Sequence, residues 1–95
     1  MKDAEFSRIA KALADPRRFE ILKVIIGAGE ISCGQVADRF PVSQSTISHH
    51  LRLLTEAGLV RVRREGQFGY FSPGQATFEK YLEALSSRLL EKVLI

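Results

Sequence analysis

The 95-residue sequence is poor in the residues and segments that mark secreted or membrane proteins. It has one cysteine, Cys33, which cannot form a disulfide within the chain and is typical of a reducing compartment. No apolar run approaches the roughly 20 residues that a membrane helix needs. The start, residues 1–5, lacks the apolar region of a signal peptide. We therefore expect a cytoplasmic protein with no membrane partner.

The sequence also lacks the patterns that catalysis and cofactor binding require. It contains no combination of nucleophile, base and orienting group, no phosphate-binding loop and no cluster of metal ligands. Gly27-Ala28-Gly29 is too short for a nucleotide-binding fingerprint and is more typical of a helix end. We expect a protein that is not an enzyme and that has no cofactor.

Length and composition predict a single domain over residues 1–95. Apolar residues make up 45% and charged residues 26% of the chain, which are values typical of globular proteins. The whole formal net charge of +3 falls within residues 39–72, which contain five arginines and two acids. Positive charge concentrated on one segment indicates a surface for phosphate groups, although a solvated basic hairpin would give the same count.

Residues 44–57 have the spacing of an amphipathic helix with an unusual polar face. Ile47, Leu51 and Leu54 share one side of the helix. The opposite side carries short hydroxyls, an imidazole and one guanidinium. These groups suit base edges in a DNA groove, although an ordinary solvated helix face is the alternative for this helix taken alone. The candidate base-reading residues are Gln44, Ser45, Ser48 and His49, with Thr46 and Arg52 as mixed base or phosphate contacts.

A second helix and a short turn precede this segment. Apolar residues within 30–40 recur at rough helical spacing, and Pro41 predicts that this helix ends near Phe40. Ser43 can cap the next helix through its side-chain oxygen. Helix, three-residue turn and helix are typical of a helix-turn-helix, expected here over residues 31–57, whose second helix enters the major groove.

A basic hairpin is predicted after the recognition helix, over residues 60–72. Gly58 ends the helix, and Val60 and Val62 alternate with arginines as in a half-buried strand, with the valines expected to point inward. Glu65-Gly66 is the predicted turn, and the second strand runs from residue 67 to 72. The candidate contacts with phosphates or the minor groove are Arg61, Arg63, Arg64, Gln67 and Tyr70.

Two helices are predicted in the first third of the chain. The first covers residues 3–14 and has an apolar stripe at helical spacing. Asp15-Pro16 then predicts the capped start of the second helix, which ends at Gly27-Ala28-Gly29. The apolar residues of this second helix are expected to lie in the core: Phe19, Leu22, Val24, Ile25 and Ile26.

The last predicted helix covers residues 75–94 and has an apolar stripe that continues to Val93. This stripe is broad for so small a domain, and a short chain builds only a thin core. We expect the excess apolar surface to pair with the same helix of a second chain, the alternative being packing within one chain. The candidate dimer-interface residues are Phe6, Ile9, Leu13, Phe78, Leu82, Leu85 and Leu89.

With these segments in view, the chain resembles the ArsR/SmtB family of small bacterial winged-helix repressors over nearly its full length. The matching segments are ALADPRRFEIL at 12–22, SQSTISHHLRLL at 43–54, EAGLV at 56–60 and RREGQFGYF at 63–71. The resemblance implies a mainly α fold with a β-hairpin wing, in the order α-α-α-α-β-β-α. It also implies a homodimer joined by its first and last helices, a double-stranded DNA operator with an inverted repeat, and repression relieved by a chemical signal.

The sequence departs from the family at its metal-binding positions. Metal-sensing members often carry a Cys-x-Cys pair in the helix before the recognition helix, where this chain has Ser32 and Gly34. Zinc sites on the family's last helix use Asp, His and Glu, whereas the last helix predicted here has no Asp or His, and its glutamates are expected to be solvated. The adjacent His49 and His50 point about 100° apart and cannot easily share one ion, so His50 is expected to be structural. We therefore expect no metal site.

Two alternatives remain at this point. A thiol-responsive or redox-responsive repressor would sense its signal through Cys33, the candidate redox residue, although a buried small apolar role is the more ordinary explanation of this cysteine. A winged-helix adaptor would bind proteins instead of DNA, but it would more often expose an apolar patch than a basic hairpin.

Overall fold

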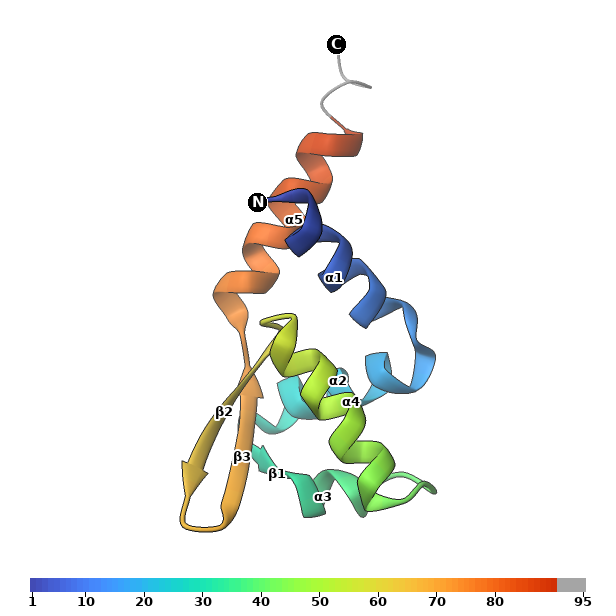
Figure 1. Ribbon diagram of the computed structural model, residues 1–95, viewed down its shortest axis with the longest axis vertical. Helices are drawn as coiled ribbons and strands as arrows, with labels where there is room; N and C mark the ends of the chain where they lie inside the picture. Colours follow the sequence, from blue (N-terminus) through green and yellow to red (C-terminus); the bar gives the residue numbers. More distant parts are fainter. Residues whose placement is uncertain (91–95) are drawn as a thin grey trace.

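The computed structural model describes residues 1–90 and confirms the predicted fold class, mainly α with a β-hairpin wing (Figure 1). The end of the helix expected at 75–94, including Val93, lies outside the described residues. Within residues 1–90, no helix is long and apolar enough to cross a membrane. The elements are α1 (Asp3–Ala14), α2 (Pro16–Ala28), β1 (Ile31–Ser32), α3 (Cys33–Ala37), α4 (Gln44–Glu56), β2 (Val60–Glu65), β3 (Phe68–Pro73) and α5 (Gln75–Leu89).

The core lies between α2, α4 and the base of the sheet. The inner side of α4, with Ile47, Leu51 and Leu54, is buried as its spacing predicted. The prediction for α2 was wrong at Phe19 and Ile26, which are 45% and 53% exposed. The buried side of α2 consists of Ile21, Leu22 and Ile25, and at about 100° per residue the two exposed residues lie to the side of it.

Side-chain caps fix the N-terminal ends of α2 and α4. Asp15 accepts a hydrogen bond from the backbone N–H of Arg18 at 2.9 Å, with Pro16 as the first helical residue, as predicted. Ser43 accepts from the N–H of Thr46 at 3.2 Å and so caps α4. Gly58, with φ of 78°, ends α4 in a left-handed conformation that suits glycine. The recognition helix therefore begins and ends close to where the sequence predicted.

The segment before α4 differs from the prediction. Its helix ends at Ala37 instead of near Phe40, and Ile31–Ser32 form a strand instead of a helical turn. This strand, β1, pairs with β3 through Ile31 opposite Phe71. The backbone groups of β1 bond to a strand some 40 residues away in sequence, and local helical spacing cannot reveal such a partner.

The wing is formed by β2 and β3 in a sheet of order β1-β3-β2. Glu65 pairs with Phe68, so the turn residues are Gly66-Gln67, one position later than predicted. Gly66 has φ of 60° and no other turn residue has a positive φ, which is typical of a type II′ turn. Val62 is 38% exposed and does not point into a core, because the hairpin extends away from the helices beyond Val60 (Figure 1).

The first and last helices lie side by side at the end of the molecule opposite the wing tip (Figure 1). The Phe6 and Tyr81 rings are 5.0 Å apart, and Arg88 forms an ion pair with Asp3 at 2.8 Å. The molecule is elongated, 50 Å by 26 Å by 23 Å, and α5 extends from the central core. One side of α5 therefore packs on α1, and the side away from α1 has little of the chain near it.

Candidate nucleic-acid interface

The outer side of α4 is exposed and entirely polar. All six residues predicted to contact DNA from this helix are exposed, while the inner side is buried. They are Gln44, Ser45, Thr46, Ser48, His49 and Arg52. A helix that buries its apolar side and exposes short hydrogen-bonding side chains has the chemistry required for contact with base edges.

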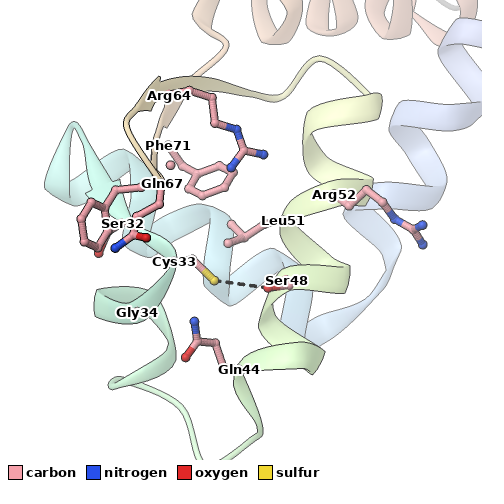
Figure 2. Close-up of a pocket in the computed structure, with 12 residues that line it drawn as sticks. Ser32, Cys33, Gly34, Gln44, Ser48, Leu51, Arg52, Arg64, Gln67 and Phe71 are labelled. Carbon is pink, nitrogen blue, oxygen red and sulfur yellow. Dashed lines mark hydrogen bonds between the residues drawn. The ribbon is translucent and has the colours of Figure 1, made fainter.

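Hydrogen bonds among these side chains determine which groups are free to donate. Arg52 Nη2 lies 3.0 Å from His49 Nδ1. A guanidinium can only donate, so Nδ1 accepts and the imidazole proton lies on Nε2. His49 therefore presents an N–H donor outward, while Arg52 points away from the wing (Figure 2).

A cleft of about 400 Å³ separates α4 from the wing. Gln44 and Ser48 line it from the recognition helix, and Arg64 and Gln67 line it from the hairpin (Figure 2). Cys33, at the start of α3, also lines the cleft, and its Sγ lies 3.4 Å from Ser48 Oγ. The structure thus brings together predicted residues of the helix and of the wing around one concave surface.

The two adjacent arginines of the wing differ in their surroundings. Arg63 forms ion pairs with Glu30 at 3.0 Å and Glu65 at 2.6 Å, and its guanidinium lies 4.8 Å from the centre of the Tyr70 ring. Arg64 lies on the cleft side, beside Gly69, and forms no ion pair with any residue from 1 to 90. The two carboxylates partly neutralise Arg63, so Arg64 is the more available cation.

Glu30 is the residue of this surface that the sequence analysis missed. The hydrogen bond from Arg63 lowers the pKa of the Glu30 carboxyl and raises the pKa of the guanidinium. Glu30 is 33 residues before Arg63 in the chain, and only the pairing of β1 with β3 brings the two together. No local motif in the sequence signals this contact.

His50 lies on the buried side of α4, as expected for a structural histidine. It is 9% exposed, and its Nδ1 lies 3.3 Å from Arg18 Nη1. Burial lowers the pKa of His50, and the Arg18 charge lowers it further against the opposing effect of Asp15. The imidazole is therefore held neutral with its proton on Nε2.

No metal-binding group of three or more His, Cys, Asp or Glu side chains occurs among residues 1–90. Cys33 has Ser32 and Gly34 as its chain neighbours, and the partner of its sulfur is the hydroxyl of Ser48. The remaining cavity-lining groups around Cys33 are amides, arginines and apolar side chains, which are poor ligands for a soft metal. That this chain senses no metal stays a prediction.

The residues predicted for the dimer interface on α1 and α5 differ in their exposure to solvent. Leu82 and Leu89 are 49% and 60% exposed, and Leu90, the C-cap residue of α5, is 54% exposed. Phe6, Leu13, Phe78 and Leu85 are partly buried. Ile9 has no exposed surface, so it belongs to the core of its own chain and cannot contact a second one.

The chain is similar in sequence and in structure to known helix-turn-helix proteins. A helix-turn-helix domain family matches residues 13–63, about half of the chain. The transcriptional repressor SdpR of Bacillus subtilis is 39% identical over 66 residues, which cover 70% of this chain and 72% of that protein. An ArsR-like transcriptional regulator from Rhodococcus matches with a TM-score of 0.82 at 31% identity, over 93% of this chain and 82% of the other. A homodimeric winged helix-turn-helix DNA-binding domain from Mycobacterium bovis matches with a TM-score of 0.73 at 26% identity, over 95% of this chain and 91% of the other.

Proposed function

Since the chain belongs to the ArsR family of winged helix-turn-helix transcriptional regulators, we propose that it represses transcription as a homodimer bound to an inverted-repeat operator. The observation that carries the proposal is the outer side of α4. Its exposed short donors and acceptors border the same cleft as Arg64 and Gln67 of the wing. One continuous surface can then contact bases in the major groove and phosphates or the minor groove beside it.

Each predicted contact residue has a specific part in this proposal. Ser48 and His49 contact base edges, and the N–H that His49 presents suits an acceptor such as N7 or O6 of guanine. Arg61 and Arg64 neutralise phosphates from the wing. The remaining contacts form the periphery of the interface: Gln44, Ser45, Thr46, Arg52, Arg63, Gln67 and Tyr70.

The dimer part of the proposal rests on the exposed leucines of α5. Leu82 and Leu89 are seven residues apart on one side of the helix, two turns along, and each exposes about half of its surface or more. A second copy of the same helix would remove these side chains from water, and a twofold interface of this kind is self-complementary. The likeness to a homodimeric domain from Mycobacterium bovis supports a dimer. The proposed interface residues are Phe6, Leu13, Phe78, Leu82, Leu85 and Leu89.

Selection of bound sequences from a random DNA pool tests the proposal directly. The expected result is an inverted repeat whose half-sites lie about one helical turn apart, ~34–36 Å. The selected operator placed upstream of a reporter gene should lower transcription when the protein is present. Recovery of sequences without any common half-site, together with salt-insensitive binding, would contradict the proposal.

The contact between Cys33 and Ser48 favours a second candidate, repression relieved by modification of the thiol. A group added to Cys33 Sγ would lie in the cleft beside the Ser48 hydroxyl, which is 3.4 Å away on the side of α4 proposed to contact DNA. The test is operator affinity of the parent and Cys33→Ser proteins with and without peroxide. Release of the parent alone would establish this candidate, and equal behaviour of both proteins would exclude it.

The same two proteins test the proposed absence of metal sensing. The positions of the family's Cys-x-Cys pair hold Ser32 and Gly34, so zinc, cadmium or arsenite should leave operator affinity unchanged. Titration of each metal into the complex, followed by fluorescence anisotropy of labelled DNA, measures this. Release of the parent that Cys33→Ser abolishes would reveal a sensor site around the single thiol.

A further inference from the structure

Arg18 connects three helices through a single guanidinium. It is the third residue of α2, and its backbone N–H is already bound by the Asp15 cap. Its Nε donates to the carbonyl oxygen of Ala12 at 2.8 Å, and its Nη2 donates to that of Lys11 at 3.2 Å. Its Nη1 donates to Nδ1 of His50 at 3.3 Å. The side chain thus joins the end of α1 to the middle of α4.

The α1 end of this contact uses groups that the helix itself cannot satisfy. Lys11 and Ala12 lie among the last four residues of α1, whose carbonyl groups have no partner within the helix. A cation at the carboxyl end of a helix is also favoured by the helix dipole. Arg18 therefore fixes the end of α1, one of the two helices of the proposed dimer interface.

The α4 end of the contact determines how the recognition helix is rotated. His50 lies on the buried side of α4 and directly follows Ser48 and His49, which face outward. A rotation of α4 that moved the His50 ring away from Arg18 would turn both outward side chains with it. The guanidinium is planar and its donors have fixed directions, so all three hydrogen bonds form together in only one arrangement of the helices.

From this geometry we propose that Arg18 is a positioning residue for DNA recognition, which fixes the orientation of α4 relative to α1 and thereby the spacing of the two half-sites that a dimer can bind. The inference rests on the proposed function, because spacing has a meaning only for a dimer on a two-part operator. Arg18 meets α4 on its buried side, through His50, and not among the exposed side chains proposed to contact DNA.

A series of operators that differ only in the distance between half-sites provides the test. The selected operator is compared with versions that carry one or two extra base pairs at its centre. The parent should lose about tenfold or more in affinity on the altered spacings, because its recognition helices are held one turn apart. Arg18→Lys keeps the charge but lacks the planar donors. Its affinity for the altered spacings should be no more than about threefold below its affinity for the selected operator.

Matched variants separate positioning from general damage. Arg17→Lys alters the neighbouring cation, whose guanidinium contacts the Phe40 ring instead of His50, and should behave as the parent does. His50→Asn places an amide oxygen near the position of the histidine Nδ1. Leucine has nearly the shape of asparagine but no acceptor, so His50→Leu is the matched control. The asparagine variant should keep the spacing preference, and the leucine variant should lose it. This pair also provides the test if Arg18→Lys does not fold.

The outcomes distinguish failure of the positioning role of Arg18 from failure of the proposed function. Spacing preference retained by folded, dimeric Arg18→Lys, or equal behaviour of His50→Asn and His50→Leu, would overturn the positioning role. A parent protein with no spacing preference would instead overturn the proposed dimeric recognition of an operator. Sedimentation equilibrium on each variant shows that its dimer is intact before the affinities are compared.

Discussion

Two parts of the molecule expose opposite kinds of surface. The reading unit, defined here as α3, α4 and the wing, exposes mainly hydroxyls, amides, one imidazole and arginines around a cleft, together with two apolar side chains of the wing, Val62 and Phe68. The pairing unit, defined as α1 and α5, exposes Leu82 and Leu89 on a flank of α5. A polar, basic surface suits the phosphates and bases of DNA, whereas an apolar one suits a second copy of the same helix. The difference indicates that one chain binds two partners at opposite ends.

Changes in the pairing unit should have the largest effect on DNA binding. Leu82→Glu with Leu89→Glu places charge on the exposed side of α5 and should leave a folded monomer. A monomer holds one half-site only, and loss of the second contact should lower operator affinity by at least about 100-fold. Light scattering gives the mass and anisotropy gives the affinity. A dimer that survives both substitutions would show that α5 is not the interface.

Changes on the outer side of α4 should have the next largest effect. Ser48→Ala and His49→Ala each remove a proposed base contact and should cost about 1–3 kcal/mol on the operator. Binding to random DNA should change little, because phosphate contacts remain. Dimer mass should be unaltered, which separates these variants from the α5 variants. Unchanged preference for the operator in both would mean that another surface contacts the bases.

The adjacent wing arginines provide a comparison within the reading unit. Arg64→Ala should remove about one phosphate contact. The slope of log affinity against log salt concentration should therefore become less steep by about 1 on all DNA sequences. Arg63→Ala should have a smaller effect, because Glu30 and Glu65 partly neutralise that cation. Glu30→Gln should strengthen binding to any DNA by removing a negative charge and releasing Arg63. Equal salt slopes for Arg63→Ala and Arg64→Ala would contradict this difference.

The smallest predicted effect concerns the stability of the free protein in mild acid. Burial lowers the pKa of His50 below its ordinary value of 6.5, so the unfolded chain binds a proton there before the folded chain does. The free energy of unfolding should therefore fall as the pH drops below about 6.5, until His50 protonates in the folded state as well. His50→Asn should flatten this slope in urea unfolding measured between pH 7 and pH 5. A parent that is as stable at pH 5 as at pH 7 would contradict the neutral, buried state of His50.

The difference between local signals and contacts across the fold explains how much the sequence revealed. The recognition helix was predictable because Ser43, the apolar spacing and Gly58 are all local signals. The strand β1 and the contact between Glu30 and Arg63 were not, because both depend on pairing between distant segments. Phe19 and Ile26 were assigned to the core on apolar character alone, and only the neighbours of α2 determine which of its sides is buried. Ile9 was assigned to the dimer interface for the same reason, although it faces its own chain.

The most direct test of the account compares binding to the full operator with binding to the same DNA after one half-site is scrambled. If the reading unit and the pairing unit act together, one dimer binds each operator, and the scrambled half-site lowers affinity by about 100-fold or more. Sedimentation velocity of the complex with labelled DNA gives both the stoichiometry and the affinity. Equal affinity for the two DNAs, or one chain per operator, would contradict the claim that a dimer reads both halves.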